Sequence, residues 1–140
     1  MSGPSRRSTF AKRPAPATPS WAEISLGALA SNFKTLQKLA KGSRLLPVVK
    51  ADAYGHGSGP VSKALLRAGA DCLAVAFVQE GVRLRRAGIR VPILVLTPTL
   101  PVEIPELLRN KLIPQVGSVE GARELSRAAG RLGKIGRAHV

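Results

Sequence analysis

The feature that most constrains this sequence is a regular alternation of apolar runs and amphipathic segments after residue 44. The apolar runs lack internal polar alternation, which is typical of strands buried on both faces of a parallel sheet. The segments between them have helical spacing, with proline or glycine near their ends. The predicted strands are residues 45–51, 72–77, 91–96 and 112–116, and the predicted helices are residues 60–68, 78–87, 101–110 and 118–130. This alternation predicts an α/β fold.

One further strand and helix precede these units. WAEIS, residues 21–25, alternates apolar and polar residues and predicts a short strand. The next segment places leucines and Phe33 at helical spacing, with Ser25 as N-cap and Gly42 past the end.

Two parallel architectures fit this order of elements. A doubly wound sheet needs helices on both faces, whereas a β/α barrel needs eight strand–helix units and typically about 250 residues. The chain has 140 residues and four units after the first helix. As a barrel it would be the N-terminal half of one, so we expect a fragment of a larger domain.

The charge balance raises the question of a nucleic-acid partner. Twenty-two Lys and Arg against eight Asp and Glu give a net charge of +14. However, aromatic residues make up only 4%, too few for stacking on single strands, and the basic residues are spread over predicted outer helix faces. We therefore interpret the net positive charge as that of solvated helix faces and a basic tail, and not as a nucleic-acid-binding surface.

Other classes are excluded by composition. The single cysteine, Cys72, rules out an internal disulfide framework and a metal site of several thiolates, so we expect no metal. No apolar stretch reaches the roughly 20 residues that span a bilayer. Residues 1–20 are rich in Ser, Pro and basic residues without an apolar core, so they predict a disordered tail and not a secretory signal. We expect a cytoplasmic protein.

The segment PVVKADAYGHG, residues 47–57, holds the candidate chemistry. Lys50 ends an apolar run, at the carboxyl end of its predicted strand, where side chains of β/α barrels act on substrates. Alone, such a lysine would be expected to extend into solvent. Glycines at 55, 57 and 59 allow a sharp turn and close approach to a ligand, and Tyr54 offers a hydroxyl donor. An amine among apolar neighbours has its charged form disfavoured, which suits a Schiff-base lysine.

A dinucleotide-binding fingerprint is the competing interpretation of these glycines. GHGSG is not the full G-x-G-x-x-G pattern, and Asp71 precedes the second predicted strand instead of ending it. The dinucleotide interpretation is therefore weak.

VVKADAYGHG closely resembles the pyridoxal-phosphate signature of the alanine racemase family. WAEISLGALASNF is similar to that family's opening strand and helix, and AGADCLAVAFVQEGVRLRRAGI and PILVL are similar to its next barrel unit and third strand. The resemblance covers residues 21–134 and implies the N-terminal part of a β/α (TIM-like) barrel.

By this resemblance, Lys50 would bind pyridoxal 5'-phosphate covalently and act as the base facing D-alanine. Tyr54 would donate a hydrogen bond to the cofactor phosphate. His56 is interpreted as packing within the loop. The full-length protein would be a homodimer that interconverts L- and D-alanine and supplies D-alanine for peptidoglycan.

The chain departs from the family in what it lacks. Racemisation needs a second base on the opposite face, which in the family is a tyrosine in a later segment, yet Tyr54 is the only tyrosine here. The family's arginine partner of the pyridine nitrogen and its C-terminal β domain have no counterpart either. We therefore expect this chain by itself to be inactive.

The final residues, IGRAHV (135–140), allow two interpretations. They match the in-frame translation of a common sequencing-library adaptor, which we favour, or they begin a further strand. Two other functions also remain open, a broad-specificity amino-acid racemase of the same fold and a basic nucleic-acid-binding module.

Overall fold

The structure is a computed structural model that describes residues 22–133. The strands are β1 (Leu73–Val75), β2 (Ile93–Pro98) and β3 (Ile113–Gln115). The helices are α1 (Leu26–Leu39), α2 (Lys50–Tyr54), α3 (Ser58–Arg67), α4 (Val78–Arg86), α5 (Ile104–Arg109) and α6 (Val119–Arg131), with the 3₁₀ turn η1 (Pro101–Glu103) before α5. The predicted tail 1–20 and residues 135–140 lie outside the described residues.

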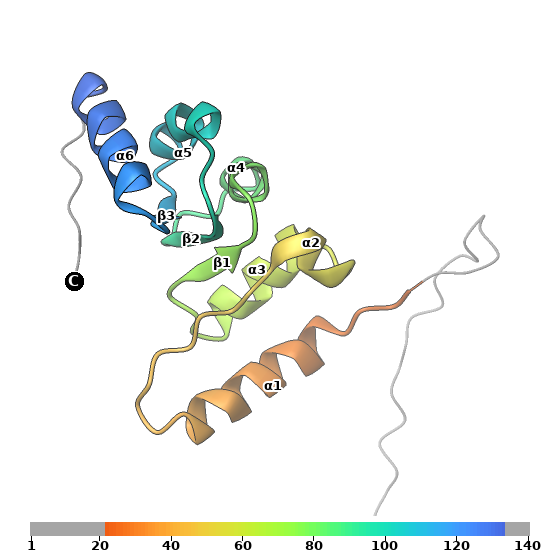
Figure 1. Cartoon of the computed structure of the whole chain (residues 1–140). Coiled ribbons are helices and arrows are strands. Elements are labelled where there is room, and N and C mark those ends of the chain that lie inside the picture. Colours follow the sequence, from red (N-terminus) through yellow and green to blue (C-terminus); the bar gives the residue numbers. More distant parts are fainter. Residues whose placement is uncertain (1–21, 134–140) are drawn as a thin grey trace, which may run out of the picture.

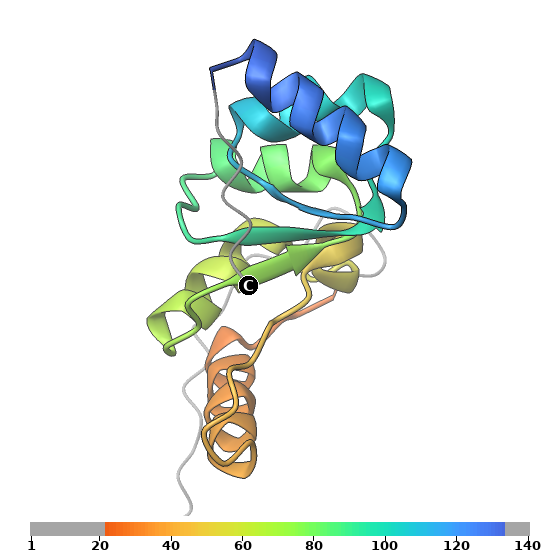
Figure 2. The same cartoon turned by 60° about the vertical axis from the view of Figure 1, so that its left-hand side comes forward.

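All strands are parallel and lie in chain order. The sheet order is β1-β2-β3, and an isolated parallel bridge from Val48 to Ala74 adds the segment before β1 at one edge. A doubly wound sheet reverses its strand order at a switch point, whereas a barrel adds each strand next to the last. The observed order therefore supports the predicted barrel segment. Figures 1 and 2 show α1 beside α3, and α4, α5 and α6 grouped on the opposite side of β1 from α1.

The two faces of the sheet differ in burial. On one face, Leu73, Ile93 and Val95 are completely buried in the hydrophobic core. On the other face, Leu94 is half-buried and its register partner Ile113 is 45% exposed. The first face holds the main core, because the helices pack against that side.

Close packing between α4 and the sheet depends on a glycine. A Cβ added to Gly81 would lie 2.8 Å from Cδ1 of Leu112, which is too close without a shift of that side chain. Gly81 thus lets α4 approach the residues that lead into β3.

Helix boundaries follow the sequence prediction closely. Ser25 caps α1 by accepting a hydrogen bond from Ala28 N at 3.2 Å, and Ser118 caps α6 by accepting one from Gly121 N at 3.0 Å. The helix predicted at 60–68 begins earlier, at Ser58.

Two strand predictions need correction. Residues 22–25 form no strand, and among the described residues no backbone hydrogen bond pairs them with another strand. The predicted strand 45–51 is reduced to the bridge at Val48, and Lys50 already begins α2. Val49 explains this change, because its ψ of 27° departs from extended backbone.

Candidate active site

Lys50 lies at the carboxyl end of the first strand-like segment. Val49 N donates to Ala74 O and Ala74 N donates to Pro47 O, both at 2.8 Å, so this segment pairs with β1 up to Val49. Lys50 follows directly, in the position expected for a functional residue of a β/α barrel.

The side chains of Lys50 and Tyr54 are both available to a ligand. Lys50 is half-buried, and the Tyr54 side chain is 60% exposed. Within residues 22–133, neither side chain forms a hydrogen bond or an ion pair. The structure therefore carries an unpaired amine and an unpaired phenol on one short turn.

That turn has an unusual backbone. Ala51, Asp52 and Ala53 have φ of 49–54° and ψ of 46–48°, and Tyr54 has φ of 55°. These are left-handed helical angles, which cost roughly 1–2 kcal/mol for each residue with a side chain. Four such residues in succession form a strained left-handed turn. Strain of this kind is typical of functional sites, provided that surrounding contacts hold it.

Glycines end the turn, as the sequence predicted in part. Gly55 and Gly57 have φ of 80° and 85°, where a side chain would add strain. Gly59 instead lies inside α3 and has no such requirement, so its predicted role in the turn is wrong.

Asp52 fastens the end of the turn to α3. Its Oδ1 accepts hydrogen bonds from Ser58 N at 2.7 Å and from Ser58 Oγ at 2.8 Å. These bonds hold the pKa of Asp52 below its usual value. The Ser58 backbone N–H has the larger effect and the Ser58 hydroxyl the smaller one. The ionised carboxylate is thus the form that stabilises this connection.

Glu80 fastens the beginning of the turn to β1 and α4. Its Oε1 accepts from Ala51 N at 2.6 Å, and its Oε2 accepts from Ala76 N at 2.7 Å and Phe77 N at 3.1 Å. One half-buried carboxylate therefore receives three backbone N–H groups from two separate strand ends.

His56 closes the turn through its ring. Its Nδ1 lies 2.8 Å from Ala53 O and 3.0 Å from Tyr54 O. Two carbonyl oxygens accept from this nitrogen only if it carries a proton. The interpretation of His56 as a packing residue of the loop agrees with these contacts.

An apolar groove of about 650 Å³ lies between α1 and the segment before Lys50. Tyr54 and His56 line one side of it, together with apolar residues such as Leu29, Phe33 and Val48. Val49 and Tyr54, on either side of Lys50 in the sequence, both line this groove, whereas the Lys50 side chain does not.

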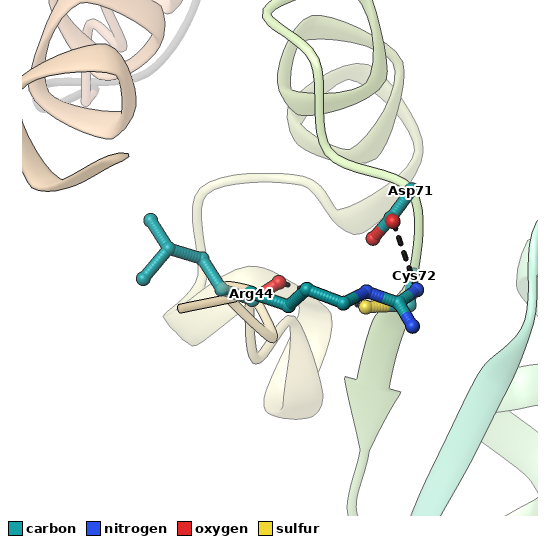
Figure 3. A network of polar contacts seen from close by, with 4 residues as sticks. Arg44, Asp71 and Cys72 are labelled. Atoms are coloured by element: carbon teal, nitrogen blue, oxygen red, sulfur yellow. Dashed lines mark hydrogen bonds and ion pairs between the residues drawn. The ribbon is translucent and has the colours of Figure 1, made fainter. Parts of the chain in front are cut away.

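The amino ends of the strands are held by different residues. Arg44 and Asp71 form an ion pair at 2.8 Å, and Cys72 Sγ donates to Leu45 O at 3.5 Å (Figure 3). Burial raises the pKa of the Cys72 thiol, which favours its neutral form. Asp71 therefore has a structural partner at the start of β1, which further weakens the dinucleotide interpretation.

The sequence interpretation missed Asp52, Ser58 and Glu80 as parts of this site. A signal existed for Glu80, because an acidic residue in the first turn of a helix often accepts the N-cap amide. Its bond to Ala51, which is 29 residues away in the chain, depends on the tertiary fold.

Comparison with known proteins decides the family. The family model described as "Alanine racemase, N-terminal domain" matches residues 24–140. The chain belongs to the alanine racemase family. An alanine racemase of Clostridium novyi is 46% identical over 122 residues, which are 87% of this chain and 32% of that protein. One of Methanococcus maripaludis is 43% identical over 123 residues, again 87% of this chain and 33% of that protein.

Solved racemases confirm the predicted fold. The Clostridium difficile alanine racemase in complex with cycloserine matches with a TM-score of 0.77 and 38% identity, over 85% of this chain and 33% of that one. A histidine racemase of Leuconostoc mesenteroides matches with a TM-score of 0.72 at 23% identity, over 77% of this chain and 29% of that one, which shows a shared fold alone. The chain thus spans about a third of the length of the alanine racemases it matches.

The residues of this alanine racemase domain fit pyridoxal phosphate. The unpaired Lys50 amine is the group that forms a bond with an aldehyde, and the unpaired Tyr54 hydroxyl is a donor for a phosphate oxygen. Within residues 22–133, no three His, Cys, Asp or Glu side chains are grouped as metal ligands, and no helix is long and apolar enough to cross a membrane.

Proposed function

We propose that this domain binds pyridoxal 5'-phosphate through Lys50 and serves in the interconversion of L-alanine and D-alanine. The observation that carries the proposal is the free Lys50 amine on a strained, fastened turn at a strand's carboxyl end. The 46% identity to an alanine racemase supports alanine as substrate. The same evidence favours an enzyme domain over a nucleic-acid-binding module.

In this mechanism each residue has a defined task. Nζ of Lys50 would hold the cofactor, and once the substrate amine has replaced it there, the freed amine would be the base that removes or returns the Cα proton on one face of the substrate. Bound pyridoxal phosphate supplies an electron sink for the charge left on Cα. The Tyr54 hydroxyl donates to a phosphate oxygen and so fixes the cofactor's position.

Inversion at Cα also requires proton transfer on the opposite face. Tyr54 is the only tyrosine among residues 1–140, and this proposal assigns it to the cofactor phosphate. In this proposal the opposing base is a tyrosine outside these residues, supplied across a homodimer interface. The product D-alanine would serve peptidoglycan synthesis in the cytoplasm.

The test uses the natural-length protein, meaning the gene product that contains residues 22–133 in its source. Borohydride reduction with pyridoxal phosphate should label Lys50, and the label should be located by peptide mass spectrometry. Lys50→Ala should lose the label, the visible absorbance of the bound cofactor and racemase activity. Lys63→Ala, which removes an exposed lysine of α3, is the matched control and should retain all three.

Label found mainly on Lys34, Lys38 or Lys63 would contradict the assignment of Lys50. Retention of the visible absorbance band in Lys50→Ala would contradict it as well. Competition between alanine and other amino acids in the same assay decides between a dedicated alanine racemase and a broad-specificity enzyme.

A further inference from the structure

We propose that Glu80 is a positioning residue for Lys50, because its carboxylate fixes the peptide plane that joins Lys50 to Ala51. This inference rests on the proposed function, since it takes Lys50 to be the residue that binds the cofactor. Glu80 itself does not touch the reacting atoms in this proposal. It acts through the backbone.

The two oxygens of Glu80 serve two different segments. Oε1 accepts from Ala51 N at 2.6 Å, whereas Oε2 accepts from Ala76 N at 2.7 Å and from Phe77 N at 3.1 Å. Ala76 and Phe77 directly follow β1, and Ala51 directly follows Lys50. The carboxylate therefore ties the end of β1 to the backbone of the lysine.

The bond to Ala51 constrains Lys50 because the peptide unit is planar. The Ala51 N–H and the Lys50 C=O belong to one rigid plane, so fixing the N–H direction also fixes the carbonyl. This plane is the entry into the left-handed turn, where Ala51 has φ of 49°. A short hydrogen bond to an ionised acceptor is stronger than a neutral one, which suits a contact that must hold a strained backbone.

Helix capping alone does not explain this arrangement. Glu80 lies in the first turn of α4, and its Oε2 bond to the N-cap residue Phe77 is an ordinary capping contact. Capping leaves the second oxygen free to face solvent. Here Oε1 instead bonds to Ala51, 29 residues earlier in the chain, so Glu80 has a second task.

The geometry also explains why glutamate is needed. Glutamine keeps the length but replaces one acceptor oxygen with an NH₂ group, which would face a backbone donor on one side. Aspartate keeps the charge but is one methylene shorter. It can accept from the nearby Ala76 or Phe77 N–H without reaching Ala51 as well.

The test compares Glu80→Gln and Glu80→Asp with Glu23→Gln in the natural-length protein. Glu23 is exposed and has no hydrogen bond or ion pair within residues 22–133. The first measurement is amide hydrogen exchange in a peptide covering residues 49–57, referred to a peptide covering residues 93–97 of β2, whose backbone has no hydrogen bond with Glu80 among the described residues. Both Glu80 variants should speed exchange at Ala51 by about tenfold or more, the loss expected for one charge-assisted hydrogen bond.

The second measurement is the visible circular dichroism that bound pyridoxal phosphate acquires from its protein surroundings. Loss of a fixed Lys50 backbone should reduce this signal per bound cofactor and lower kcat more than it changes KM. Glu23→Gln should change neither. If Glu80→Gln does not fold, Glu80→Asp carries the test, because it retains a charged cap for α4.

Unchanged exchange at Ala51 in a folded Glu80 variant would overturn the proposal. A lower melting temperature with unchanged cofactor dichroism would also overturn it and leave Glu80 as a capping residue. If the unsubstituted protein binds no pyridoxal phosphate, the proposed function fails, and with it the role of Glu80 in positioning a cofactor. The exchange measurement would then still report whether Glu80 holds the turn.

Discussion

The loops at the two ends of the sheet are held by side chains of opposite charge. At the carboxyl ends, the carboxylates of Asp52 and Glu80 accept backbone N–H groups from the loops. At the amino ends, the guanidinium of Arg85 donates to backbone carbonyls of Ile89, Val91, Asn110 and Lys111, at 2.8–3.1 Å. Both arrangements provide hydrogen-bond partners for backbone N–H or C=O groups of the loops that have no strand partner.

The difference lies in what each end leaves free. At the carboxyl ends, the fastened turn presents a lysine and a tyrosine whose side chains have no partner in the part of the chain that the structure describes. At the amino ends, Arg85 uses its donors on the protein itself, and burial lowers its pKa without removing its charge. We therefore expect substitutions at the amino ends to change stability alone, whereas substitutions at the carboxyl ends change stability where they remove a fastening carboxylate and chemistry where they remove Lys50 or Tyr54. Three predictions test this contrast, from the largest expected effect to the smallest.

The largest effect is expected for Arg85→Met. Methionine retains much of the apolar stem but leaves four loop carbonyls without their donor, which should lower the free energy of unfolding by about 2–4 kcal/mol. Racemase activity per folded molecule should change by less than about twofold, because Arg85 lies away from Lys50 at the other strand ends. Chemical denaturation and activity of the natural-length protein measure the two quantities.

Arg86→Met is the matched control for this prediction. Arg86 is the next residue of α4 and is exposed, and its side chain makes no hydrogen bond or ion pair within residues 22–133. Its substitution should be nearly neutral. Equal destabilisation by both substitutions would show that helix charge, and not the carbonyl contacts of Arg85, is responsible.

An intermediate effect is expected for Tyr54→Phe, now at the carboxyl ends. The 60% exposed ring makes no described hydrogen bond, so its hydroxyl contributes little to folding. Loss of a hydrogen bond to a charged phosphate should weaken pyridoxal phosphate binding by about 1–3 kcal/mol. Cofactor titration after dialysis measures the affinity, and thermal unfolding without cofactor should show no change. Unchanged affinity would remove Tyr54 from the cofactor site.

Much of this contrast could be predicted from the sequence. The alternation of apolar runs and helices predicted the α/β fold, and the position of Lys50 after an apolar run predicted its place at a strand end. Both depend on local patterns that a single chain displays directly. The caps at Ser25 and Ser118 were predictable for the same reason.

The connections that hold the site were not predictable in this way. Asp52, Ser58 and Glu80 look like ordinary polar residues, and their roles follow from contacts between segments far apart in sequence. The conformational preferences of the residues also did not predict the left-handed turn, because residues with side chains rarely adopt such angles in succession. The strand prediction was wrong over residues 22–25, because alternation of apolar and polar residues does not by itself supply a neighbouring strand.

The smallest effect, and one that depends on pH, is expected for Asp52→Asn. The pKa of Asp52 is lowered in the folded protein, chiefly by the Ser58 backbone N–H, so the ionised form stabilises the fold. This contribution is fully present above the unfolded pKa of about 3.9 and is lost as pH falls through the lower folded pKa. Asparagine can still accept from Ser58 but lacks the charge. Its melting temperature should therefore lie slightly below that of the unsubstituted protein at pH 7, and the difference should shrink below about pH 4. Glu23→Gln, which removes an exposed carboxylate without a described hydrogen bond, should show no such convergence. A difference that stays constant down to pH 2 would mean that side-chain shape, and not ionisation, fastens the turn to α3.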